Sequence, residues 1–217
     1  MNRKLLVKFL SWPLFLAAIL ALTALACASG GPYVEEFDSV GSWGSGDDAD
    51  VTGNVNGGRF EILVKAETGI YWSTGGEDFS DGTYEVEATH LEGTEDNGYG
   101  MLFRSSETDD FYLFEVSSDG FVWIGLCKGG CEDDVVMLVD EGWFASEAVN
   151  TGLNVTNRLR VQAEGGNLIF FVNDQEVGRA TDTTLTTGDI GILVETLGEG
   201  GVKVAFDNFK FTPLENN

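Results

Sequence analysis

Short stretches of apolar residues, separated by glycine, are the feature that most limits how this chain can fold. Between residues 33 and 211, runs rich in Val, Ile, Phe, Tyr and Thr are broken by Gly, Asp and Asn. No stretch repeats apolar residues at helical spacing, so the pattern predicts an all-β domain. We expect strands at 34–38, 58–65, 69–73, 82–91, 98–105, 110–117, 120–126, 134–140, 157–164, 167–173, 175–180, 188–196 and 201–211.

The junctions between these runs are typical of hairpin turns. Residues 118–120, 164–167 and 173–174 each separate two strand-like runs and consist mainly of Gly, Asp and Asn, which accept a positive φ. No internal repeat and no low-complexity block occurs. A propeller or a solenoid is therefore not expected.

Alternation within the runs indicates which faces are buried. In residues 82–89, Tyr84, Val86 and Ala88 point one way and Glu85 and Glu87 the other, which predicts an antiparallel strand with one face in water.

Two later runs lack this alternation. Residues 111–116 and 121–126 are apolar or aromatic on both faces, so these strands are covered on both sides or carry a binding surface. Many short strands of these kinds predict two packed antiparallel sheets. We expect one β-sandwich over residues 34–213, with a short tail at 214–217.

The first 26 residues have the three-part layout of a secretory signal. Arg3, Lys4 and Lys8 give a positive start, residues 9–26 carry no charge, and small residues precede Cys27. An uncleaved transmembrane anchor is the alternative, because the apolar run is near the roughly 17 residues that span a bilayer. We expect cleavage and export.

The residues around Cys27 resemble a bacterial lipoprotein box, in which the cysteine is lipidated and becomes the first residue of the mature protein. The segment 24–26 (ALA) would also serve ordinary signal peptidase, which would release a protein with a spare thiol. With lipidation, residues 27–33 form a lipidated Cys and a flexible tether, because Gly and Ser favour coil. The expected location is then the cell surface or the outer face of a membrane, and otherwise the medium.

The mature part is strongly acidic. Residues 1–26 hold three of the 12 Lys and Arg and none of the 36 Asp and Glu, so the remainder has 9 basic and 36 acidic side chains, a net charge of −27. Nucleic acid is excluded as a partner, since phosphate binding needs clustered basic residues. Contact with a membrane is expected only through the lipid. The charge admits neutral glycans, cations such as Ca²⁺, or a basic cell-surface partner, and it also suits plain solubility.

Two of the three cysteines lie close together. Cys127 and Cys131 flank Lys-Gly-Gly, and the two glycines allow a tight reversal that brings the sulfurs within disulfide range. We expect a disulfide at a hairpin tip, with a metal site or a redox pair as the less favoured alternatives.

A series of motifs, in order, resembles the concanavalin A-like jelly rolls of the laminin-G type and of the keto-disaccharide hydrolase-like (DUF1080) type. The resemblance covers roughly residues 34–211 and implies a two-sheet antiparallel jelly-roll sandwich whose curved sheet often presents a glycan-binding concave face. The motifs are 37–38 (FD) with Trp43, 78–87 (DFSDGTYEVE), 98–104 (GYGMLFR), 110–120 (DFYLFEVSSDG), 157–161 (NRLRV), 171–174 (FVND), 188–192 (GDIGI) and 204–209 (VAFDNF).

Sugar binding needs aromatic faces for stacking and a few polar groups for the hydroxyls. The central strands offer both kinds of side chain, although a Phe-rich core also needs aromatics, and Arg104 with Glu115 or Asp110 also suits a structural pair. The candidate ligand-binding residues are Tyr71, Trp72, Tyr99, Arg104, Tyr112, Glu115 and Trp123.

No catalytic residues can be assigned. The Glu-x-Asp-x-(x)-Glu pattern of glucanases with this fold is absent, Glu85 and Glu87 belong to a regular solvent-facing strand, and the single histidine, His90, has no evident nucleophile beside it. The sequence therefore favours a surface-tethered, non-catalytic carbohydrate-binding or interaction module. A glycoside-acting hydrolase of the DUF1080 type and a structural envelope protein without a small ligand are the alternatives.

Asp38 and Asp207 lie where related sandwiches bring their termini together, so we consider a structural Ca²⁺ between them. The acidic residues at 47–50 fit a solvated loop better.

Overall fold

The computed structural model describes residues 31–131 and 134–214. The predicted signal peptide and the lipidation site Cys27 lie outside these ranges. Within them, no helix is long and apolar enough to span a membrane.

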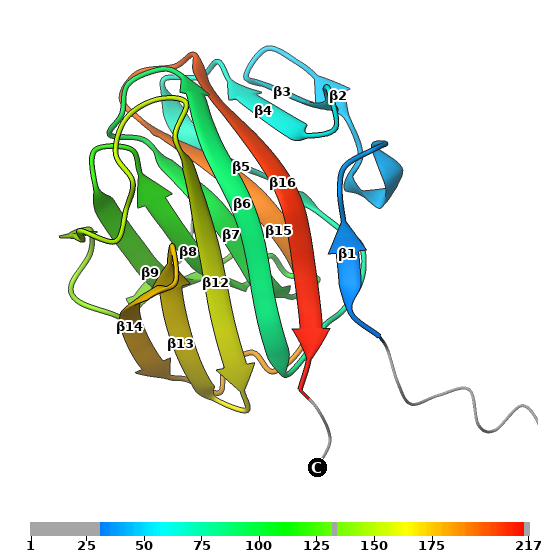
Figure 1. Cartoon of the computed structure of the whole chain (residues 1–217), viewed down its shortest axis with the longest axis vertical. Coiled ribbons are helices and arrows are strands. Elements are labelled where there is room, and N and C mark those ends of the chain that lie inside the picture. The colour runs from blue at the N-terminus through cyan, green and yellow to red at the C-terminus, as the bar shows by residue number, and fades with distance from the viewer. Residues whose placement is uncertain (1–30, 132–133, 215–217) are drawn as a thin grey trace, which may run out of the picture. The chain divides into compact units, whose positions relative to one another are not determined.

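The described chain forms two antiparallel sheets (Figure 1). The nine-stranded sheet has the order β14-β13-β12-β6-β16-β4-β3-β2, and β1 also pairs with β16. Its strands are β1 (Tyr33–Glu35), β2 (Gly46–Asp47), β3 (Val51–Val55), β4 (Phe60–Val64), β6 (Gly82–Glu92), β12 (Thr156–Glu164), β13 (Asn167–Val172), β14 (Gln175–Thr181) and β16 (Val202–Pro213).

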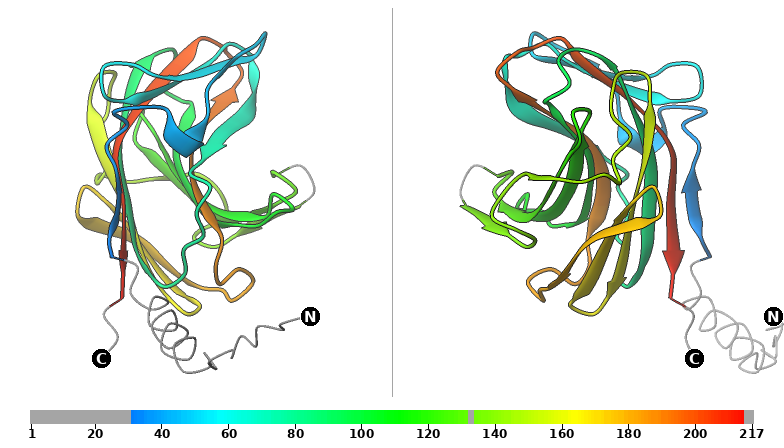
Figure 2. Two further views of the ribbon diagram at one scale, coloured as in Figure 1. Left: turned by 90° about the vertical axis from the view of Figure 1, so that its right-hand side faces the viewer. Right: turned by 60° about the vertical axis from the view of Figure 1, so that its left-hand side comes forward.

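The seven-stranded sheet has the order β10-β9-β8-β7-β15-β5, and β11 also pairs with β9. Its strands are β5 (Thr68–Thr74), β7 (Gly98–Ser105), β8 (Phe111–Ser117), β9 (Phe121–Lys128), β10 (Asp134–Met137), β11 (Phe144–Ala145) and β15 (Asp189–Leu197). Figure 2 shows the β9–β10 hairpin reaching out on the side away from the nine-stranded sheet. One short 3-10 helix, η1 (Gly41–Trp43), precedes β2.

The predicted all-β sandwich is confirmed, and each predicted run overlaps one strand. The predicted turns are also present; Asn173 and Asp174, for example, have φ of 49° and 66° between β13 and β14. The sequence did not predict β2, β3 or β11. β3 is partly exposed and polar, and it forms because it pairs with β4 along its whole length, from Val51↔Val64 to Val55↔Phe60.

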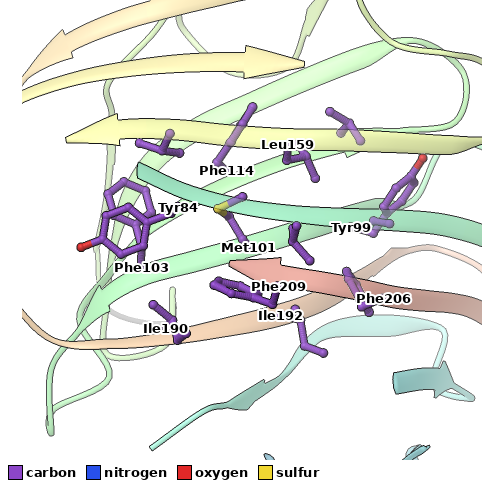
Figure 3. Close-up of a cluster of buried hydrophobic side chains, with 14 of the residues drawn as sticks. Tyr84, Tyr99, Met101, Phe103, Phe114, Leu159, Ile190, Ile192, Phe206 and Phe209 are labelled. Carbon is purple, nitrogen blue, oxygen red and sulfur yellow. The ribbon is translucent and has the colours of Figure 1, made fainter. Parts of the chain in front are cut away.

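The hydrophobic core lies between the two sheets (Figure 3). Tyr84 and Val86 of β6 are fully buried there, whereas Glu85 and Glu87 face outward as the alternation predicted. Met101, Phe103 and Phe114 of the seven-stranded sheet complete this layer. The core fixes the two sheets face to face and leaves each sheet one outer face.

Candidate functional site

The outer face of the seven-stranded sheet carries a second hydrophobic cluster. Because side chains alternate along a strand, residues next in sequence to core residues point outward: Leu102 beside Met101, and Leu113 beside Phe114. This explains the runs that are apolar on both faces. The cluster comprises Leu102, Phe111, Leu113, Cys127 and Leu193, with Ile70, Trp72, Trp123 and Cys131 partly buried around it.

A disulfide loop borders this cluster. Cys127 and Cys131 are joined as predicted, with their Cα atoms 4.4 Å apart. Gly129, Gly130 and Cys131 all have positive φ, which the two glycines adopt without steric cost. The loop is anchored to the β7–β8 connection, because the Gly130 N–H donates a hydrogen bond to the carbonyl oxygen of Asp109 at 2.8 Å.

Trp72 lies between this loop and the sheet. Its ring centroid is 5.6 Å from that of Phe111, and a Cβ added to Gly130 would stand 2.9 Å from its ring. The indole is thus held on two sides while part of it stays exposed. An aromatic surface fixed in this way loses little conformational entropy when a ligand covers it.

A hollow of about 580 Å³ opens between β5, β15 and the disulfide loop. This volume is within the range of small-molecule sites. The hollow is lined by Thr68, Gly69, Ile70, Tyr71, Trp72, Asp109, Gly129, Gly130, Cys131 and Glu195.

Glu195 at the edge of the hollow forms a pair with Glu115. Glu115 lies opposite Gly100 of β7 and Glu195 opposite Gly98, so the two carboxyl groups approach across a strand that has no side chains between them. Glu115 Oε2 would stand 2.5 Å from a Cβ on Gly98, and an edge of the Trp143 ring would stand 3.2 Å from the same point. The missing side chains make room for the pair, and Trp143 covers it.

The environment of this pair favours the protonated form. Burial, and then the charge and hydrogen bond of Glu195, raise the pKa of Glu115 well above its usual range. Burial also raises the pKa of Glu195. Two like charges in contact cannot both ionise easily, so the two carboxyl groups share a proton by a hydrogen bond. Neither forms an ion pair with any Lys, Arg or His of the described residues.

The predicted ligand-binding residues divide into two groups. Trp72 lines the hollow from the outer face, whereas Tyr71, although also among the lining residues, packs its side chain against the core between the sheets. Glu115 and Trp123 lie side by side on the outer face, directly opposite each other in β8 and β9. Glu195 was not predicted.

Tyr99, Tyr112 and Arg104 belong to the framework instead, since none of the three is exposed. Tyr99 packs in the core, as Figure 3 shows, and Tyr112 donates a hydrogen bond to Asp182 at 2.5 Å. Arg104 binds Asp81 at 2.8 Å and two loop carbonyl oxygens at 3.0 Å. Neither carboxylate that we considered for it, Glu115 or Asp110, is its partner. We correct the prediction for these three, because strands apolar on both faces give no alternation from which to assign sides.

His90 contacts a serine that the sequence did not reveal. Its Nδ1 is 2.9 Å from Ser118 Oγ, and its Nε2 is 2.8 Å from the carbonyl oxygen of Glu92. Both side chains are fully buried, and burial lowers the pKa of His90. A neutral imidazole shielded from solvent supports the fold here and has no access to a substrate.

No cluster of three or more His, Cys, Asp or Glu side chains suited to a metal ion occurs in residues 31–131 and 134–214. The Asp207 carboxylate accepts a hydrogen bond from the N–H of Asn208, and Asp38 lies three residues after the end of β1. The structural Ca²⁺ between Asp38 and Asp207 stays a prediction.

A second hollow, of about 340 Å³, opens at the side of the sandwich between η1, β3, β4 and β5. Trp43, Phe60 and Ile62 line it, and Asp48 is its one carboxylate. Asp48 is already bonded to the N–H groups of Asp50 and Val51. The hollow beside Trp72 is the stronger candidate, because no N–H group of the described residues is bonded to the carboxylates of Glu195 or Asp109 that line it.

No protein-family model and no curated protein sequence matches this chain. Several solved structures are similar to this chain. A carbohydrate-binding module, CBM66, from Bacillus subtilis is 19% identical, with 79% of this chain and 96% of that chain covered and a TM-score of 0.61. A Bacillus licheniformis β-glucanase is 15% identical over 86% and 100% of the two chains, with a TM-score of 0.60.

A Bacillus subtilis protein of unknown function with a galectin-like fold is 12% identical, covers 85% of this chain and 97% of its own, and has a TM-score of 0.61. At these identities the likeness concerns the fold. Together with the two antiparallel sheets, it shows that this chain has the concanavalin A-like jelly-roll fold.

Proposed function

We propose that this domain is a non-catalytic carbohydrate-binding module of the cell envelope, and that the hollow beside Trp72 is its binding site. The observation that carries the proposal is the presence of a fixed, half-buried indole and a carboxyl group, Trp72 and Glu195, in one hollow of about 580 Å³. An indole face stacks on the apolar face of a sugar ring, and a carboxylate accepts hydrogen bonds from hydroxyl groups.

The fold supports the proposal at a coarser level. The solved structures with similar folds include a carbohydrate-binding module and glucanases, so a carbohydrate-related function fits this architecture. Because unrelated functions share this fold, the assignment depends on the site itself.

The carboxyl pair argues against glycoside hydrolysis. A retaining glycosidase holds its two carboxyl groups about 5–5.5 Å apart, and an inverting enzyme holds them further apart. Glu115 and Glu195 are in hydrogen-bonding contact, and Glu115 is buried. A glycosidic bond cannot fit between them in this arrangement. Binding without cleavage is the function that this geometry favours over the hydrolase.

The proposed location rests on the sequence before residue 31. Cys27 follows an apolar signal and precedes Ala-Ser-Gly-Gly-Pro, so a lipid on Cys27 would hold the domain at the outer face of a membrane. Cys27→Ser should release the protein into the medium. Unchanged membrane retention would contradict the tether.

Binding of the mature domain to a glycan array, followed by calorimetry with the best ligand, tests the proposal. Trp72→Ala should cost about 2 kcal/mol, as for a central binding residue, which is roughly a 30-fold weaker affinity. Phe121→Ala is the matched control, because Phe121 is an exposed aromatic residue of the same sheet that does not line the hollow. Circular dichroism checks that both variants fold.

The outcomes separate clearly. Loss of affinity in Trp72→Ala alone supports the site. No binding to any sugar by the folded wild-type domain, with or without Ca²⁺, would overturn the proposed function. Equal losses of affinity in both variants would overturn the hollow beside Trp72 as the binding site.

A further inference from the structure

The Glu115–Glu195 pair has no positive partner among the described residues, whereas other partly buried carboxylates of the molecule do. Glu115 is 1% exposed, and its Oε2 receives no hydrogen bond from any N–H or O–H donor of the described residues. Other partly buried carboxylates are satisfied: Glu61, for example, is 2.7 Å from Lys203 Nζ. A buried, unpaired carboxylate is costly, so this pair needs either a proton or a cation.

The pair reaches the hollow through Glu195. Glu115 Oε2 stands over Gly98, the residue directly opposite Glu195 in the neighbouring strand, and Glu195 lines the hollow. Asp109 also lines the hollow, and Trp72 supplies an aromatic face. A positive group that enters the hollow therefore meets carboxylates and a π face, both of which attract cations.

We propose that the hollow selects a cationic sugar, an amino sugar whose ammonium group binds the Glu115–Glu195 pair while its ring stacks on Trp72. This inference rests on the proposed function and specifies its ligand class. The net charge of −27 in the chain after residue 26 favours the approach of such a ligand, since it attracts cations from solution.

Binding is coupled to release of the shared proton. The ammonium group replaces that proton as the positive partner, so the pair ionises fully and the proton passes to solvent. Affinity then rises as the pH increases through the raised pKa of the pair, as long as the amine remains protonated.

Most of the groups around the pair do not titrate. Gly98 and Gly100 of β7 form the floor, Trp123 of β9 and Trp143 lie alongside, and the titratable groups on the walls of the hollow are Tyr71 and Asp109.

Calorimetry with two matched ligands tests the inference. The probes are a glucosamine tetramer and the same tetramer with every amine acetylated, at about pH 6, where the amine carries its charge. We expect the cationic tetramer to bind at least roughly tenfold more tightly, a difference of one decade in Kd. Repeating the titration in two buffers of different ionisation enthalpy should show proton release.

Two carboxyl-to-amide variants give the control. Glu195→Gln keeps the shape of the side chain and should abolish both the preference and the proton release. Glu164→Gln removes the same charge from an exposed position at the end of β12, on the other sheet, and should keep both. Equal losses in the two variants would reduce the effect to net charge and overturn the site.

The two proposals fail differently. Equal or tighter binding of the acetylated tetramer, or cationic binding without proton release, would overturn the ammonium site while leaving a glycan-binding module in place. Absence of binding to every sugar would overturn the module itself.

Discussion

The carboxylates on the outer faces of the two sheets differ in their exposure to solvent and in their cationic partners. On the nine-stranded sheet, Glu85 lies 4.0 Å from Arg158 and 3.9 Å from Arg160, and all three side chains are partly open to solvent. On the seven-stranded sheet, Glu115 is buried and Glu195 is partly buried, and neither has a cationic partner among the described residues. The first face is a solvated surface with balanced charge. The second keeps an unbalanced charge beside a hollow, which costs stability and is therefore expected at a binding site.

Adding a side chain to the glycines under the carboxyl pair should have the largest effect on the seven-stranded sheet. A Cβ on Gly100 would stand 2.1 Å from the carbonyl oxygen of Phe114, so Gly100→Ala must push β7 and β8 apart. We expect a loss of about 3 kcal/mol or more, the upper end for overpacking. Urea unfolding measures it. Gly46→Ala is the control, because nothing lies within 4 Å of its added Cβ, and similar losses in both variants would contradict the close-packed floor.

Glu115→Gln should sharpen the contrast by stabilising the protein. The folded pKa of Glu115 is raised, so the folded state binds more protons than the unfolded state, and stability falls as the pH rises from the unfolded value through the folded one. The amide keeps the hydrogen bond to Glu195 and removes the repulsion. At pH values above 7, the Tm of the variant should exceed that of the wild type by about 2–4 °C for each kcal/mol of repulsion relieved. Near pH 4, the two Tm values should be similar. A variant that is less stable at high pH would refute the shared proton.

The same change on the other face should have almost no effect. Glu85→Gln removes two long ion pairs on an open surface, and each such pair contributes at most about 1 kcal/mol. Urea unfolding at about pH 7 checks this expectation. A loss several times larger would mean that the two faces do not differ as described.

The fold was largely predictable because its signals are local. The alternation of Tyr84, Val86 and Ala88 with glutamates fixed the buried face of β6, and the Asn173–Asp174 turn was visible as two residues that accept a positive φ. β3 was not predicted because its pairing with β4, rather than its own composition, makes it a strand.

The site was only partly predictable. Trp72 and Glu115 stood out as an aromatic and a charged residue in apolar runs, and Glu195 gave the same weak signal within Ile-Leu-Val-Glu-Thr-Leu. The pairing of Glu115 with Glu195 depends on the registers of β8, β7 and β15 across 79 intervening residues, which one sequence does not encode locally. Tyr99 and Tyr112 were assigned to the site for the related reason that their strands are apolar on both faces.

Chemical-shift mapping by NMR tests the central claim most directly, because it reports both outer faces at once. On titration with a bound oligosaccharide, we expect the largest shifts at the Trp72 indole N–H, at the backbone amides of Gly129 and Gly130, and along β5 and β15. Shifts concentrated around Arg158 and Arg160 on the nine-stranded sheet, with Trp72 unaffected, would contradict the account.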